Sequence, residues 1–385
     1  MKLAYVTHYD ATNLKGSNEW SGTGYYIAEA LKRQHINLDY IGPLKDRLHL
    51  KILGKCKRHY YELFRQRYIN NSEPIILKNF ANQISNKLIG CKVDAVFSAT
   101  TNPISYLDCD LPIVFWADAT FANILDFYPL YSHLCDEAIR DGHLMEQIAL
   151  EKCSLAIYSS DWAAQNAIKY YKANPSKVKV IPFGANITEE RTLDQVRHLV
   201  ESRSSNKCKI LFLAVDWFRK GGDVAFKVAK TLNEAGLKTE LTIVGCDPIL
   251  DEPIPDFVKP LGFINKSTDE GKAKINRLFS ESHLLILPSL ADCSPIVLCE
   301  ANSFGVPCLA TKVGGIPTII RDDINGRLFE TKANVREYCD YIIQLFYNYN
   351  HYKQLALSSF NEYQSRLNWS IAGKSVQELL GTILS

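Results

Sequence analysis

Short runs of apolar, β-branched and aromatic residues alternate along this chain with longer segments whose apolar positions recur at helical spacing. The first series of predicted strands is Leu3–His8, Asp94–Ser98, Ile113–Trp116, Leu155–Ser159 and Val178–Ile181. The second series is Ile210–Ala214, Glu240–Val244, Leu284–Leu287 and Cys308–Ala310. The predicted helices between them include Tyr25–Arg33, Gly142–Lys152, Trp162–Tyr171 and Gly222–Glu234. Strands that alternate with helices predict parallel sheets joined by crossover helices.

A polar, charged segment over residues 188–207 interrupts this pattern, and its part Ser202–Asn206 is interpreted as a linker. A chain of 385 residues suits two domains. We therefore predict an α/β chain with two Rossmann-like, doubly wound domains that face a central cleft, over residues 1–190 and 205–362. The segment Trp369–Leu384 predicts an amphipathic helix. Ligands of such sheets bind at the carboxyl ends of the strands.

Composition narrows the function classes. Apolar content of 46%, charged content of 22% and a net charge of +2 are those of an ordinary globular protein, without the basic excess that attracts nucleic acid. The eleven cysteines are scattered without Cys-x-x-Cys spacing and the nine histidines do not cluster near them, so we expect no metal site. We interpret the cysteines as reduced thiols, which favours a cytoplasmic location. The sequence predicts neither a membrane span nor a signal peptide.

The segment after the predicted strand Leu284–Leu287 carries the most informative chemistry. A short polar loop leads to a helix that begins near Ser294, with Asp292 just before it and Glu300 about two turns inside it. The first N–H groups of a helix bind anions, here those of Ile296 and Val297. A ligand with phosphates in the middle and hydroxyl groups at both ends would suit this arrangement. A nucleotide sugar is such a ligand.

Arg219 and Lys220 lie in the loop between the predicted strand Ile210–Ala214 and the helix from Gly222. Two adjacent cations at a strand-to-helix turn are suited to hold a diphosphate. These two cations would stabilise the negative charge that forms on the diphosphate when its bond to a sugar breaks. The alternative is a solvated turn that caps the helix.

The segment from Asp292 to Val306 resembles the signature of family-four retaining glycosyltransferases of the GT-B fold. The similarity extends to Arg219–Gly222, Val313–Pro317 and Asp323–Gly326. The resemblance implies that Glu300 holds the ribose and that Asp292 contacts the donor sugar. Further substrate contacts that it implies are Gly22, Gly24, Ser294, Gly314 and Gly315. We expect the nucleotide base to be recognised near Gly262, Phe263 and Ile264, mostly through backbone groups. The resemblance also implies that a helix at about 365–385 packs back onto the first domain.

The chain departs from the family pattern at several positions. Val215 stands where the family carries an Arg, and Cys293-Ser294-Pro295 replaces a Gly-Phe-Gly turn. Asp292 is shorter than the usual Glu. Asp118 stands near a position where members often have His, and we expect it to orient the acceptor. The alternative for Asp118 is a helix cap or a turn.

We therefore expect a retaining glycosyltransferase that moves a sugar from a nucleoside diphosphate to a hydroxyl of a glycan or lipid-linked acceptor. The process would be bacterial-type polysaccharide, lipopolysaccharide or glycolipid synthesis, without a metal or other cofactor. The catalytic residues would be Asp118, Arg219, Lys220 and Asp292. Two alternatives remain: an inert GT-B subunit that binds nucleotide sugars, and a GT-B nucleotide-sugar epimerase.

Residues 45–67 interleave basic residues with apolar ones. The basic residues are Lys51, Lys55, Lys57, Arg58, Arg65 and Arg67. Such a segment suits peripheral contact with an anionic membrane, which would place the protein at the inner face of that membrane. The alternative is a solvated helical face with an apolar underside.

Overall fold

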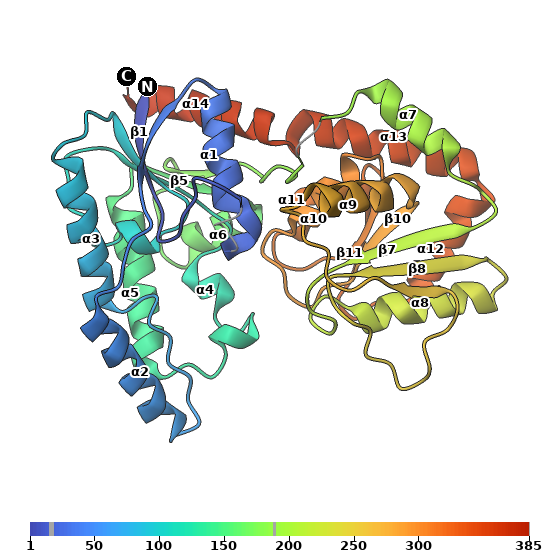
Figure 1. The fold of residues 1–385 in the computed structure, drawn as a ribbon, viewed down its shortest axis with the longest axis horizontal. Helices are drawn as coiled ribbons and strands as arrows, with labels where there is room; N and C mark the ends of the chain where they lie inside the picture. Colours follow the sequence, from blue (N-terminus) through green and yellow to red (C-terminus); the bar gives the residue numbers. More distant parts are fainter. Residues whose placement is uncertain (15–18, 188–189, 385) are drawn as a thin grey trace. The chain divides into compact units, whose positions relative to one another are not determined.

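The computed structural model describes residues 1–14, 19–187 and 190–384. The chain forms two compact units, each built around one parallel sheet (Figure 1). Unit 1 comprises Met1–Pro182 and Trp369–Ser385, and unit 2 comprises Phe183–Asn368. The chain therefore leaves unit 1 once, builds unit 2 without interruption, and returns to unit 1 at Trp369.

The sheet of unit 1 has the strand order β2-β1-β3-β4-β5-β6. Its strands are β1 (Lys2–Val6), β2 (Asn37–Ile41), β3 (Ala95–Ser98), β4 (Ile113–Ala117), β5 (Leu155–Tyr158) and β6 (Val178–Val180). Its helices are α1 (Thr23–Arg33), α2 (Leu48–Glu62), α3 (Pro74–Leu88), α4 (Phe121–Ile124), α5 (Asp136–Lys152), α6 (Asp161–Lys169) and α14 (Trp369–Leu384). Strands β3, β4 and β5 are buried along their whole length, as in a parallel sheet covered on both faces.

Helix α14 packs beside α1 within unit 1 (Figure 1). The Trp369 ring stacks on Tyr26 with ring centroids 6.3 Å apart and meets Trp116 edge-on at 5.7 Å. A Cβ atom on Gly373 would lie 2.6 Å from the Ala30 carbonyl oxygen. The missing side chain therefore lets the two helices approach closely.

The sheet of unit 2 has the strand order β12-β11-β10-β7-β8-β9. Its strands are β7 (Cys208–Leu213), β8 (Thr239–Val244), β9 (Val258–Pro260), β10 (Leu284–Leu287), β11 (Cys308–Thr311) and β12 (Gly326–Phe329). Its helices are α7 (Leu193–Ser202), α8 (Gly222–Glu234), α9 (Asp269–Glu281), α10 (Ile296–Asn302), α11 (Ile316–Ile319), α12 (Val335–Tyr347) and α13 (Tyr349–Arg366). Counted along the unit, this is the doubly wound order 3-2-1-4-5-6, which reverses between β7 and β10.

The polar, charged segment 188–207 contains a helix, whereas residues 203–206 of the predicted linker Ser202–Asn206 lie outside any helix or strand. Thr192 and Gln195 form a reciprocal capping box that starts α7. Val196 and Val200 on that helix are fully buried in the core of unit 2. Leu193 and Leu199 pack against the same core, so α7 has an apolar face although most of its other residues are polar.

Every helix within residues 1–14, 19–187 and 190–384 is too short or too polar to cross a lipid bilayer.

Candidate functional site

The loops after β7 and β10 meet at the point where the strand order of unit 2 reverses. The two strands pair directly, with Ile210 opposite Leu284. Beyond their carboxyl ends, the Leu290 N–H donates to the Arg219 carbonyl oxygen at 2.8 Å. A doubly wound sheet binds its ligand at this kind of position.

Lys220 and Asp292 form an ion pair between these two loops. Their side chains are only 14% and 8% exposed, respectively. The Ser289 hydroxyl lies 3.5 Å from the same carboxylate, and the Gly315 N–H donates to the Asp292 carbonyl oxygen at 3.2 Å. The structure thus brings the loops after β7, β10 and β11 together around one buried carboxylate.

Arg219 is held at the same place by two backbone contacts. Its N–H donates to the Asp216 carboxylate at 3.0 Å, and its Nη1 donates to the Ala291 carbonyl oxygen at 3.0 Å. The second bond places the guanidinium against the residue next to Asp292. The predicted cations and the predicted acid therefore form one cluster in unit 2.

Gly221 makes the close approach of the two loops sterically feasible. Its φ is 78°, in the left-handed region, and a Cβ atom there would lie 2.1 Å from the Pro288 carbonyl oxygen. The next residue, Gly222, lies against the Trp217 ring, which its Cβ atom would meet at 2.2 Å. Both glycines of the Arg-Lys-Gly-Gly motif are thus required by packing.

Glu300 lies inside α10 and is 3% exposed. Lys266 pairs with this carboxylate at 2.6 Å. Lys266 follows the predicted base-binding segment 262–264, in which Gly262 has a φ of 63° and Phe263 is 75% exposed. The ion pair therefore connects Glu300, which is predicted to hold the ribose, to the segment that is predicted to recognise the base. Sequence reasoning missed Lys266 because its loop matches no motif.

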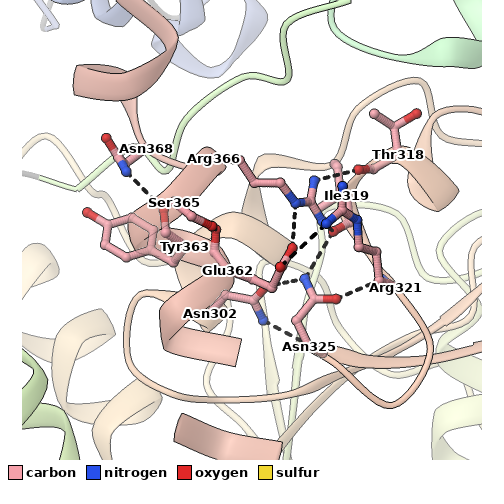
Figure 2. A network of polar contacts seen from close by, with 10 residues as sticks. All are labelled: Asn302, Thr318, Ile319, Arg321, Asn325, Glu362, Tyr363, Ser365, Arg366 and Asn368. Carbon is pink, nitrogen blue, oxygen red and sulfur yellow. Dashed lines mark hydrogen bonds and ion pairs between the residues drawn. The ribbon is translucent and has the colours of Figure 1, made fainter. Parts of the chain in front are cut away.

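Gly314 and Gly315 precede α11, and a polar network fixes the other end of that short helix (Figure 2). Arg366 donates to the carbonyl oxygens of Thr318 and Ile319 at 2.7 and 2.6 Å. The Arg366 guanidinium also pairs with Glu362 one turn earlier on α13. The position of the Gly314–Gly315 turn thus depends on a side chain from the end of unit 2.

A fully buried pair of amides, Asn302 and Asn325, lies at the centre of Figure 2. The Asn325 side chain donates to Asn302 Oδ1 at 2.7 Å and to the Ile319 carbonyl at 3.0 Å, and it accepts from the Arg321 N–H at 2.7 Å. Asn302 is on α10, two residues after Glu300. The pair therefore fixes α10 and α11 relative to each other.

The remaining predicted catalytic residue, Asp118, lies in unit 1. It follows β4 and lines a cavity of about 200 Å³ at the carboxyl ends of β1, β3 and β4. The Trp20 ring donates through Nε1 to the Asp118 carboxylate at 3.2 Å. The four predicted catalytic residues are thus divided, with Asp118 in unit 1 and the other three in unit 2.

Glu146 lines the same cavity and was missed by sequence reasoning. It is 1% exposed, accepts from the Thr101 hydroxyl at 3.0 Å and from the Tyr158 hydroxyl at 3.2 Å. Burial raises the pKa of Glu146 to about 7, despite these hydrogen bonds. A signal existed in the sequence, because Glu146 occupies the buried face of α5 together with Gly142 and Ala149.

Comparison with known proteins identifies the part of the chain that carries the cation cluster. Residues 197–359 match the model of the family described as glycosyl transferases group 1. This part of the chain belongs to that family. We refer to unit 2, which contains the matched residues, as the group 1 unit.

Individual relatives agree with this assignment. D-inositol 3-phosphate glycosyltransferase of Segniliparus rotundus is 25% identical over 180 residues, which are 45% of this chain and 40% of the relative's length. Sucrose-phosphate synthase of Thermosynechococcus elongatus matches 99% of this chain and 98% of its own, with a TM-score of 0.71 and 15% identity. Anabaena HepE, solved with UDP and glucose, matches 99% and 100% of the two chains, with a TM-score of 0.63 and 15% identity. These likenesses show that the fold is GT-B.

The departures from the family pattern can be placed in the group 1 unit. Val215 is 69% exposed, so the position at which the family carries an Arg faces solvent here. Pro295 is the N-cap of α10 and precedes the predicted phosphate donors Ile296 and Val297. Ser294 lies immediately before it. The contacts of these residues with a ligand stay predictions.

Two glycines predicted to contact substrate have structural explanations in unit 1. Gly22 is the N-cap of α1 with a φ of 78°. The Gly24 carbonyl accepts from the Tyr5 hydroxyl at 2.6 Å, and a Cβ atom on Gly24 would lie 2.1 Å from the Tyr9 hydroxyl oxygen. Neither glycine is among the residues that line the cavity. Their substrate contact stays a prediction.

Among the residues that the structure describes, one group of acids could hold a metal ion, and it lies in unit 1. Glu73, Glu137 and Asp141 have carboxylate oxygens within 4.8 Å of one another. Lys57 Nζ lies 2.8 Å from both Glu73 and Glu137, so an ammonium group already compensates this negative charge. The arrangement is that of an ion-pair network.

Proposed function

We propose that this protein transfers a sugar from a nucleoside diphosphate sugar to a hydroxyl group of an acceptor, with retention of the anomeric configuration. The observation that carries the proposal is the cluster of Arg219, Lys220 and Asp292 at the strand reversal of the group 1 unit. Two cations beside a carboxylate suit a ligand that has both phosphates and hydroxyl groups. A structure with this fold, HepE, was solved with UDP and glucose, which supports a nucleotide-sugar donor.

In the proposed reaction, the bond between the anomeric carbon and the diphosphate oxygen breaks while the acceptor oxygen bonds to the same carbon. The departing diphosphate gains negative charge, which Lys220 and Arg219 stabilise. The acceptor proton passes to the departing phosphate oxygen. Lys220 has three N–H donors, so it can bind phosphate and keep its contact with Asp292. Asp292 then accepts from a hydroxyl of the donor sugar, and Glu300 from the ribose.

Neither a metal nor another cofactor has a step in this proposal, because two side-chain cations supply the charge. Adding EDTA to the assay is expected to leave the rate unchanged. A rate that falls on chelation and recovers with Mg²⁺ or Mn²⁺ would contradict this part of the proposal.

Calorimetric titration with UDP, GDP and ADP tests the donor site directly. We expect at least one of them to bind, and we expect Lys220→Met to weaken that binding by about 100-fold, as for loss of a charged hydrogen bond. Lys227→Met is the matched control, because Lys227 lies on α8 in the same unit and its side chain is 62% exposed. The proposal fails if no nucleoside diphosphate binds, or if charge reversal of both Arg219 and Lys220 leaves binding unchanged.

Turnover separates the transferase from the two alternatives. A transferase releases nucleoside diphosphate from its donor, slowly into water and faster with an acceptor. An epimerase instead converts one nucleotide sugar into another. A subunit without catalysis binds the donor and releases no diphosphate even with cell extract as the acceptor source.

We also propose that α2 contacts an anionic membrane from the cytoplasmic side. The helix is held to unit 1 through buried Leu50 and Gly54. Large apolar side chains on it and just after it are exposed: Leu48 74%, Ile52 54%, Tyr60 57%, Leu63 76% and Phe64 60%. Lys51, Lys55 and Arg58 are exposed on the same helix. Exposed apolar side chains next to cations suit insertion at a lipid headgroup layer.

We do not expect one residue of this basic segment to contact lipid. Lys57 is half-buried and is paired with Glu73 and Glu137. Co-sedimentation with vesicles of phosphatidylglycerol and phosphatidylcholine tests the contact, with pure phosphatidylcholine as the comparison. We expect Lys55→Glu with Arg58→Glu to reduce binding to the anionic vesicles. Binding that does not depend on anionic lipid removes the proposal.

A further inference from the structure

The cavity of unit 1 lies where the strand order of its own sheet reverses. β1 pairs with β2 on one side and with β3 on the other. His8 and Tyr9 follow β1, while Thr101 follows β3, and all three line the cavity. This is the place at which a doubly wound sheet binds a ligand. Under the proposed function, the donor belongs to the group 1 unit, so this second site is available to the acceptor.

The cavity wall combines flat aromatic rings with neutral polar groups. Trp20 and Tyr131 contribute rings, and Asn71 and Asn102 contribute amides. Asn71 Nδ2 donates to the Tyr131 hydroxyl at 3.2 Å, and Asn102 Nδ2 donates to the Asn71 carbonyl at 2.8 Å. Amides and hydroxyls can each both donate and accept hydrogen bonds, as the hydroxyl groups of a sugar do. The apolar faces of a sugar ring can lie against aromatic side chains.

The described part of the wall contains two acids, Asp118 and Glu146, and the imidazole of His8, but neither Lys nor Arg. Glu146 is buried, hydrogen-bonded to Thr101 and Tyr158 and has a raised pKa, so it adds less negative charge than an ordinary carboxylate. An acceptor phosphate or carboxylate would therefore enter beside the Asp118 carboxylate, with no Lys or Arg among the described lining residues to compensate it. Such a juxtaposition of like charges in a partly dehydrated site is strongly unfavourable.

We propose that this cavity binds the acceptor as an uncharged saccharide and discriminates against phosphorylated and other anionic acceptors. The inference rests on the proposed function and adds the chemical class of the acceptor. Asp118 accepts hydrogen bonds from saccharide hydroxyls, with its orientation fixed by Trp20. Asn71 and Asn102 bind further hydroxyls.

Matched pairs of saccharides test the inference. Glucose is compared with glucose 6-phosphate, and myo-inositol with its 3-phosphate, in saturation-transfer NMR on the full chain and in transfer assays with the donor that binds. In each pair that is accepted, we expect kcat/KM for the neutral member to exceed that for the phosphate by about 100-fold. Asp118→Asn should reduce this ratio by about tenfold, whatever it does to the absolute rate. Asp110→Asn, an exposed turn acid outside the cavity, should leave the ratio unchanged.

Failure of this inference is distinguishable from failure of the proposed function. If a nucleoside diphosphate binds but the phosphorylated member of a pair is preferred, the acceptor class is wrong and the transferase proposal stands. If no nucleoside diphosphate binds, the NMR comparison still tests the cavity by itself. A panel of neutral mono- and oligosaccharides from which none binds at millimolar concentration would overturn the inference.

Discussion

Replacing Lys220 by Met should separate the structural role of its ion pair from its role in ligand binding. Asp292 is 5% exposed, and removal of the ammonium leaves its carboxylate buried beside the Ser289 hydroxyl. Breaking a buried ion pair by removing one partner costs about 3–5 kcal/mol, because the remaining charge is uncompensated. For a unit of this size, the melting temperature should fall by roughly 10 °C.

The double variant Lys220→Met with Asp292→Asn removes the uncompensated charge. We expect it to regain about 2 kcal/mol or more of the lost stability, which is a coupling energy typical of contacting residues. Its affinity for nucleoside diphosphates should not recover, because the cation is still missing. Urea unfolding followed by circular dichroism, fitted with one transition for each unit, measures the stability, and calorimetry measures the binding.

Two results would refute this reasoning. If the free energy of unfolding of Lys220→Met lies within about 0.5 kcal/mol of that of the native chain, the Asp292 carboxylate is adequately solvated without its partner. A double variant that binds the nucleotide as the native chain does would show that Lys220 does not bind the phosphates. Lys227→Met controls for the loss of a positive charge from the same unit.

Three further predictions test other parts of the structure. Because burial raises the pKa of Glu146 from 4.5 to about 7, the contribution of this carboxyl to stability is full below pH 4.5 and is lost as the pH rises through 7. Measured by urea titration relative to Glu146→Gln, the free energy of unfolding of the native chain should therefore fall by about 3 kcal/mol between pH 4.5 and pH 8. The same comparison with Glu151→Gln, at an exposed position, should show no such pH-dependent difference. Asn325→Ala should destabilise the group 1 unit by roughly 3 kcal/mol in the same assay, since it leaves several buried polar groups unpaired. Gly221→Ala should cost about 2 kcal/mol or more and weaken nucleotide binding, because the new Cβ pushes against Pro288; unchanged affinity would show that the loops tolerate separation.

The interior of both sheets and one edge strand, β6, could be predicted from the sequence, whereas the other three edge strands could not. The nine predicted strands are all present, and the three that were missed, β2, β9 and β12, lie at sheet edges. A central strand of a parallel sheet is buried on both faces and is therefore apolar throughout. An edge strand is short and mixed in polarity, as in the Val-Lys-Pro of β9. Its sequence resembles that of a loop.

The candidate site shows a similar division. Arg219, Lys220 and Asp292 could be found because each lies in a loop directly after a predicted strand, and parallel strands end at one edge of the sheet. Lys266 could not be found, because its partner Glu300 is 34 residues away and only the tertiary fold brings them together. Glu146 was missed for a different reason: a carboxylate at a buried helical position is easily taken for a surface residue.

The position of α14 constrains the order in which the chain can fold during its synthesis. The helix supplies Trp369 to a cluster with Tyr26 and Trp116, so unit 1 lacks one of its packing layers until residues 369–384 have left the ribosome. Residues 183–368 are complete before that moment. Unit 2 can therefore complete its fold before unit 1, although its synthesis starts later. Unit 1 stays partly uncovered until α14 has been synthesised.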